Sequence, residues 1–178
     1  MRLKHRFVIP VIVALSFLPA HGQLKEIPSQ AELDPILDRT DKKLADFLST
    51  LNKYQTEASE IDRERLLNDQ RDFEQLRKVI VSAHGGTKGQ GFSLGKMVAI
   101  LSGVDDAAME AAVWSNLLTT RVCTSSRPRL LEFALAVQDN GGMLREAGDQ
   151  LLHPTLRMAS AADEVISALG DSGKNPQR

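Results

Sequence analysis

The sequence predicts an all-α protein in which one long N-terminal amphipathic helix packs against a bundle of four to five shorter helices. Three observations favour this class. Apolar residues recur at alternating steps of four and three through the first half of the chain. The later apolar segments have helix length and are rich in alanine and leucine. Runs of β-branched residues typical of strands are nearly absent.

Residues 1–22 have the layout of a secretory signal peptide. Three basic residues precede an apolar run at 7–18, and the small residues Ala20 and Gly22 occupy the positions that the peptidase reads. The apolar run is too short to cross a bilayer as a helix, which takes about 20 residues, so an uncleaved anchor is the weaker alternative. We expect export to the periplasm or the extracellular space, with cleavage after Gly22 and a mature start at Gln23.

The charge balance argues against nucleic acid as a partner. The chain has 22 Lys and Arg residues against 23 Asp and Glu residues, and removal of the signal peptide leaves a mildly acidic domain. Nucleic-acid binding depends on clustered Lys and Arg that neutralise phosphates. Length and composition predict a single helical domain at 23–170 with a disordered tail at 171–178.

Cys123 is the only cysteine in the chain. No intramolecular disulfide can form, so the apolar core has to supply the stability of the fold. The simpler interpretation of Cys123 is a small buried apolar residue, and the alternative is a reactive thiol or an intermolecular disulfide.

Two helix-start signals follow the signal peptide. Ser29 to Glu32 has the pattern of a capping box, and Asp34 before Pro35 has that of an N-cap with proline at the first helical position; the second is the preferred start. Heptad spacing then continues through Leu33, Leu37, Thr40, Leu44, Phe47, Leu51, Tyr54, Ala58 and Ile61. A second run, displaced by one residue, comprises Leu66, Asp69, Phe73, Leu76, Ile80 and Ala83. No proline or glycine separates the runs, so we expect one continued or gently bent helix from Pro35 to Ala83.

Shorter helices are expected downstream, because helix-ending signals are frequent there. Ser93–Leu101 precedes a central buried helix at Asp105–Val122. Asn140 with Gly141 is a C-terminal helix signal, and Pro154 is a second one. The remaining chain is therefore predicted to divide into three short helices.

The glycine-rich stretch Gly85–Gly95 resembles a phosphate-binding loop only in composition. The pattern GxxxxGK[ST] requires glycine where this chain has Gln90, and the hydroxyl residue after the lysine is missing. The third glycine of GxGxxG comes one residue late, and the only strand that could precede such a loop is 78–83. We expect a connection between helices in which Ser93 caps the next helix, with a weak anion site as the alternative.

Acidic residues and one histidine give the only candidate for metal chemistry. Glu146, Asp149 and His153 recur at steps of three and four, so they share one helix face and could present two oxygens and a nitrogen to a metal. Helix bundles with carboxylate-bound metals use a second such set on another helix, and this chain has none. A solvated face is therefore favoured, and no catalytic residue, metal ligand or cofactor is assigned. Asp105 and Asp106 are expected at a helix start, where acids are favoured.

The leading functional hypothesis is a binding or assembly module of the cell envelope that acts through the long amphipathic helix. The partner would be another protein or a second copy of the chain, in contact along the heptad seam, and no membrane span remains after cleavage. In the structural alternative, the seam is buried wholly within the monomer. The alternative from another class is a metal-binding protein or enzyme that uses Glu146, Asp149 and His153.

Overall fold

The computed structural model describes residues 27–57, 60–84, 93–122 and 128–172. Within these ranges the chain is helical and contains no strand. The elements are α2 (Gln30–Lys53), the short 3-10 helix η1 (Gln55–Glu57), α3 (Glu60–Ala83), α4 (Leu94–Val122) and α5 (Pro128–Ser172). The all-α prediction is confirmed. The predictions for the signal peptide, Cys123 and residues 85–92 fall outside the described ranges. The same holds for residues 173–178 of the predicted tail, and α5 itself continues to Ser172.

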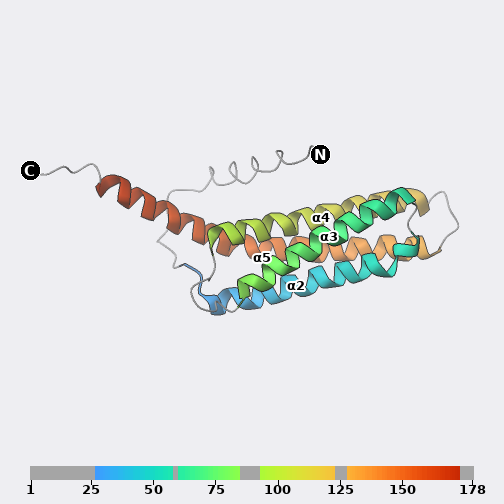
Figure 1. Ribbon diagram of the computed structural model, residues 1–178, viewed down its shortest axis with the longest axis horizontal. Helices are drawn as coiled ribbons and strands as arrows, with labels where there is room; N and C mark the ends of the chain where they lie inside the picture. Colours follow the sequence, from blue (N-terminus) through green and yellow to red (C-terminus); the bar gives the residue numbers. More distant parts are fainter. Residues whose placement is uncertain (1–26, 58–59, 85–92, 123–127, 173–178) are drawn as a thin grey trace, which may run out of the picture.

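The four α-helices form an elongated bundle in which each helix runs antiparallel to the next (Figure 1). α2 contacts α3, α3 contacts α4, and α4 contacts α5, while α5 also packs along α2 and closes the bundle. This is the up-and-down topology of four-helix bundles. It places the start of α2 and the end of α5 at the same end of the bundle (Figure 1), although they are far apart in sequence.

The heptad residues of α2 and α3 face one shared core. Seven buried residues of the first seam are Leu33, Leu37, Thr40, Leu44, Phe47, Leu51 and Tyr54. The second seam contributes Leu66, Phe73, Leu76, Ile80 and Ala83 to the same apolar cluster. Among the described side chains, the two runs predicted the buried faces correctly except at Asp69, which is half-buried; Ala58 and the side chain of Ile61 lie outside the described part. Within the described residues the seam is covered by the chain itself.

The single long helix predicted from Pro35 to Ala83 is wrong, because the chain turns back after Lys53. Tyr54 caps α2, and its backbone N–H donates to the carbonyl oxygen of Thr50. The Tyr54 ring is buried and stacks on Phe133 of α5 at 4.8 Å between centroids. The one-residue displacement of the second seam lies where the helices separate. Two amphipathic helices packed face to face cover each other's apolar seam, whereas a single straight helix would leave both seams without a partner in the chain.

The preferred start of this first helix is also wrong, because α2 begins after Ser29. The Ser29 hydroxyl accepts a hydrogen bond from the backbone N–H of Glu32 at 3.3 Å. Pro35 consequently lies inside the helix rather than at its first position. The Glu32 side chain pairs with Arg157 of α5, so tertiary contact supports the earlier start.

The predicted breaks in the second half of the chain are absent, because α4 and α5 are both long and continuous. Asp105 and Asp106 lie in the interior of α4 and not at a helix start. Gly141 does not end a helix either: a Cβ atom placed there would lie 3.1 Å from the Cβ of Ala111 on α4. A Cβ at Gly103 would lie 2.7 Å from Leu76 Cδ1 of α3. These glycines permit close approach of neighbouring helices.

Pro154 is inside α5 as well, so its prediction as a helix end is wrong. Proline cannot donate to the carbonyl four residues earlier and bends a helix that continues past it. Beside it, the buried Thr155 hydroxyl donates to the carbonyl oxygen of Leu151 at 2.7 Å, one turn earlier in the same helix. The final turns of α5 project beyond the bundle (Figure 1), and Val165 and Ile166 are exposed there.

Candidate functional site: the cleft between α3 and α4

A shallow hollow of about 420 Å³ lies between α3 and α4. Its lining residues are polar or charged: Glu64, Arg65, Asn68, Asp69 and Glu110. Three carboxylates and one guanidinium therefore face a single concave surface. We call this surface the α3–α4 cleft.

Trp114 of α4 lies beneath the α3–α4 cleft and is almost fully buried, at 1% exposure. Its indole Nε1–H donates to Asp69 Oδ2 at 2.7 Å. On the core side, the indole ring packs against Phe133 at 6.0 Å between centroids. A buried indole N–H needs an acceptor, and Asp69 provides it from the neighbouring helix.

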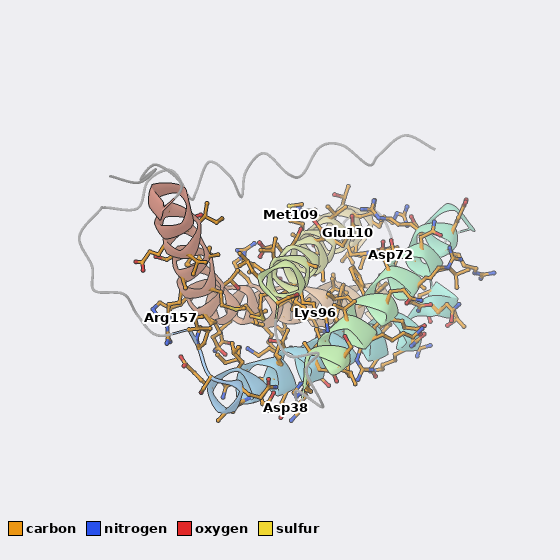
Figure 2. All side chains as sticks on the ribbon, turned by 60° about the vertical axis from the view of Figure 1, so that its left-hand side comes forward. Asp38, Asp72, Lys96, Met109, Glu110 and Arg157 are labelled. Carbon is orange, nitrogen blue, oxygen red and sulfur yellow. The ribbon has the colours of Figure 1, made fainter. Side chains whose placement is uncertain are left out.

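Arg65 joins the same two helices on the outer side of this contact. Its Nη2 atom lies 2.5 Å from Glu110 Oε2, and its Nε also donates to that oxygen at 3.2 Å. The guanidinium carbon lies 5.7 Å from the Trp114 ring centroid, within the range of a cation–π contact. Figure 2 shows Glu110 of α4 and Asp72 of α3 on the same side of the bundle. The indole therefore contacts a carboxylate at its edge and a cation over its face.

The pKa of Asp69 is raised to about 6. Burial is the largest cause, and the negative charges of Glu110 and Asp72 act in the same direction. The hydrogen bond from Trp114 and the positive charge of Arg65 oppose the rise. Asp69 therefore changes protonation at a mildly acidic pH, at which an ordinary aspartate is fully ionised.

Two further carboxylates on α4 have raised pKa values. Burial raises the pKa of Asp105, with help from Asp106 and Asp149, and burial and Glu110 raise that of Asp106. Together with the α3–α4 cleft they make this half of α4 rich in negative charge. Such a surface attracts cations and repels anions.

The α3–α4 cleft presents hydrogen-bond acceptors and an excess of negative charge. The described residues contain no group of three or more His, Cys, Asp or Glu side chains placed to hold a metal ion. The residues that line the α3–α4 cleft include carboxylates, an amide and a guanidinium, and no serine, threonine, cysteine or lysine. These side chains are suited to binding an ammonium or guanidinium group.

The predicted acidic and histidine face of α5 lies elsewhere and is not assembled into a metal site. Glu146 accepts a hydrogen bond from Lys43 Nζ of α2 at 2.8 Å. The same lysine lowers the pKa of Glu146. Asp149 and His153 are exposed on α5, and Asp149 lies near enough to Asp105 of α4 to help raise its pKa. The Glu146 carboxylate thus helps to join α5 to α2 and already has a cation as partner.

His84 at the end of α3 lies between two aspartates of α2. Its Nδ1 atom is 3.7 Å from Asp34 Oδ1, and its Nε2 atom is 3.3 Å from Asp38 Oδ1. Gln30 Nε2 donates to the carbonyl oxygen of Ala83 nearby. This polar cluster joins the start of α2 to the end of α3, which is a structural role. Ser93 caps α4 by accepting from the backbone N–H of Lys96 at 3.2 Å, as predicted.

Sequence reasoning missed the α3–α4 cleft, although one signal for it was present. Asp69 occupies an apolar position of the second heptad run, between Leu66 and Phe73. A carboxylate at such a position has to meet a polar partner when the stripe is buried. The partner is Trp114, which was predicted only to lie in a buried helix. Asp69 and Trp114 are 45 positions apart in the sequence, and no local pattern indicates that they pair.

Comparison of the chain with protein-family models, with curated proteins and with solved structures finds no match. Among the described helices, none is both long enough and apolar enough to cross a membrane.

Proposed function

We propose that the chain is an exported binding module of the cell envelope that recognises a positively charged protein segment through the α3–α4 cleft. The observation that supports this proposal most directly is that Glu64, Asp69 and Glu110 line one hollow, in which Arg65 provides a single guanidinium group. The lining has an excess of negative charge, and a cationic side chain of a partner would offset it.

The geometry supports recognition over catalysis for two reasons. Asp69 and Glu110 have partners on the protein already, Trp114 and Arg65, and these contacts hold their oxygens in place. A pre-arranged set of acceptors is suited to binding. The hollow is shallow, so it would take the end of a side chain from a partner surface in place of an enclosed small molecule.

A lysine-rich peptide tests the proposal when it is titrated into the mature chain that begins at Gln23. Trp114 is the only tryptophan, so its emission reports binding directly at the α3–α4 cleft. We expect saturable binding that weakens in about 0.5 M NaCl, because salt screens exposed charges. The double variant Glu64→Gln with Asp69→Asn should lose this binding.

The matched control removes two exposed carboxylates from α5, Glu132→Gln with Asp139→Asn. It changes the net charge by the same amount and should bind as the parent does. Equal loss of binding in both double variants would show that only net charge matters, and absence of any saturable binding would reject the proposal.

Export is part of the same proposal and rests on the residues before Gln23. The intact mass of the protein recovered from the periplasm or medium should correspond to a chain that starts at Gln23. A chain recovered only with residues 1–22 attached would contradict cleavage after Gly22.

Self-association is the second candidate, favoured by the exposed apolar residues at the projecting end of α5. Val165 and Ile166 are 61% and 66% exposed, while the heptad seam of α2 is buried in the core. Assembly along the long N-terminal seam, as the sequence suggested, would require the bundle to open, so the end of α5 is the accessible surface. Light scattering measures the molar mass of the parent protein and of the double variant Val165→Asp with Ile166→Asp. If the chain assembles through the end of α5, the parent has a larger molar mass than a monomer and the double variant does not.

A further inference from the structure

We propose that Asp69, where it meets Trp114, is a pH-sensitive latch between α3 and α4: the two helices pack more closely when Asp69 gains a proton and less closely when Asp69 is ionised. The proposal concerns the conformation of the bundle and does not depend on what the α3–α4 cleft binds. It starts from the position of one carboxyl group that is partly removed from water at the junction of two helices.

The charged groups that act on Asp69 come from both helices. On α3 these are Arg65 and Asp72, with Glu64 also on the lining of the cleft, and on α4 the group is Glu110. From α5 the neighbour of Trp114 is the apolar ring of Phe133. The ionised Asp69 therefore faces the negative charge of Glu110 across the α3–α4 interface, and Arg65 offsets part of it.

Protonation removes this repulsion and the cost of burying a charge, which is the largest effect on Asp69; the hydrogen bond from Trp114 becomes weaker but is not lost. A neutral carboxyl group keeps a carbonyl oxygen that can accept from the Trp114 indole N–H. Arg65 then has Glu110 as its remaining partner in the α3–α4 cleft, across the same interface. The loss of the repulsion and the pairing of Arg65 with Glu110 alone both favour closer contact between α3 and α4. Ionisation reverses them, because like charges and desolvation both oppose a buried carboxylate.

The burial pattern gives the latch a direct optical readout. Trp114 is the only tryptophan in the chain, and it is nearly inaccessible to solvent. Its indole nitrogen is bonded to the titrating group itself. Emission and acrylamide quenching therefore both report the immediate surroundings of this contact, which comprise α3, α4 and Phe133 of α5.

The experiment is a pH titration of Trp114 emission on the full mature chain between about pH 4.5 and pH 8, with acrylamide quenching at both ends. We expect a single transition with a midpoint near 6. Quenching should be weaker on the acidic side. Asp69→Asn should abolish the transition and keep quenching weak at every pH, since an amide oxygen accepts from the indole and carries no charge.

Two further variants make the test specific to the proposed neighbours. Glu110→Gln should move the midpoint down by about half a unit to one unit because it removes a negative charge, and Arg65→Met should move it up by a similar amount. Both shifts can be measured even if Asp69→Asn fails to fold. His84→Gln and His153→Gln, which remove the histidines of the described chain, should leave the midpoint unchanged.

Several results would overturn the latch. These are an emission that does not change across this pH range, a transition that persists in Asp69→Asn, and a midpoint that follows either histidine. Stronger quenching at acidic pH than at neutral pH would contradict the direction of the change.

Discussion

Two adjacent glycines in α5, Gly141 and Gly142, give the most decisive mutational test of the bundle. Both are interior to the helix, but their surroundings differ. A Cβ on Gly142 would meet nothing within 4 Å, whereas a Cβ on Gly141 would lie 3.1 Å from the Cβ of Ala111. Substitution by alanine therefore has the same effect on helix propensity at both positions and a different effect on packing.

The expected magnitudes follow from these contacts. Glycine to alanine in a helix interior stabilises by roughly 0.5–1 kcal/mol, so Gly142→Ala should raise the melting temperature by about 1–4 °C for a domain of this size. In Gly141→Ala the same gain is opposed by crowding against α4, which costs about 1–3 kcal/mol when a packed interface has to shift. Gly141→Ala should therefore be less stable than Gly142→Ala by about 1–3 kcal/mol.

Urea unfolding followed by circular dichroism measures both variants on one scale. A double-mutant cycle with Ala111→Gly isolates the contact, and its coupling energy should exceed about 0.5 kcal/mol, because space made on α4 relieves the crowding. If Asn140 and Gly141 ended a helix, as the sequence alone suggested, both glycine variants would lose stability, since alanine is strained in the left-handed conformation of such an end. That outcome would refute a continuous α5, and equal stabilisation of both variants would refute the close approach to Ala111.

Three further predictions concern polar groups. Asp69 has a pKa raised to about 6, so its protonated form stabilises the fold. This contribution is complete at low pH and is lost as the pH rises through 6. Asp69→Asn should therefore increase the free energy of unfolding by about 1 kcal/mol at neutral pH, after allowance for solvent screening, and should leave it unchanged near pH 4. A variant that is stabilised most at acidic pH would contradict this sign. Asn140 is buried and donates to the Thr50 hydroxyl at 2.9 Å and to the Ala136 carbonyl at 2.6 Å, so Asn140→Ala should destabilise by about 1–2 kcal/mol in chemical unfolding, with Asp139→Asn as the neutral neighbour. Arg77 donates from Nε and Nη2 to the two carboxylate oxygens of Asp41, which raises the pKa of the arginine. A double-mutant cycle with Arg77→Met and Asp41→Asn should give a coupling energy of about 0.5–1 kcal/mol at low salt and a smaller one at high salt.

The burial pattern is the part of the fold that local sequence determined. Leu33, Leu44 and Ile80 fall at heptad spacing and are fully buried, because a helix presents residues at steps of three and four on one face whatever it packs against. The Ser29 and Ser93 caps are likewise local, since each serine accepts a hydrogen bond from a backbone N–H three residues ahead. The all-α class follows from the same short-range rules.

The boundaries of the helices were decided by packing between them. No proline or glycine marks the turn after Lys53, and the chain reverses there because two amphipathic faces have to cover each other. Gly141 and Pro154 carry helix-ending signals, yet α5 continues through both. Contacts with α4 and α2 along its length outweigh propensities of the order of 1–3 kcal/mol.

The α3–α4 cleft belongs wholly to the tertiary structure. Asp69 and Trp114 are 45 positions apart in sequence and meet only because α3 and α4 are antiparallel neighbours. Periodicity shows which face of a helix is buried and contains no information about which residue of another helix lies opposite. The helical class and the buried side of each helix were therefore determined locally, whereas the helix boundaries and the pairing of a carboxyl group with an indole depended on how the bundle closed.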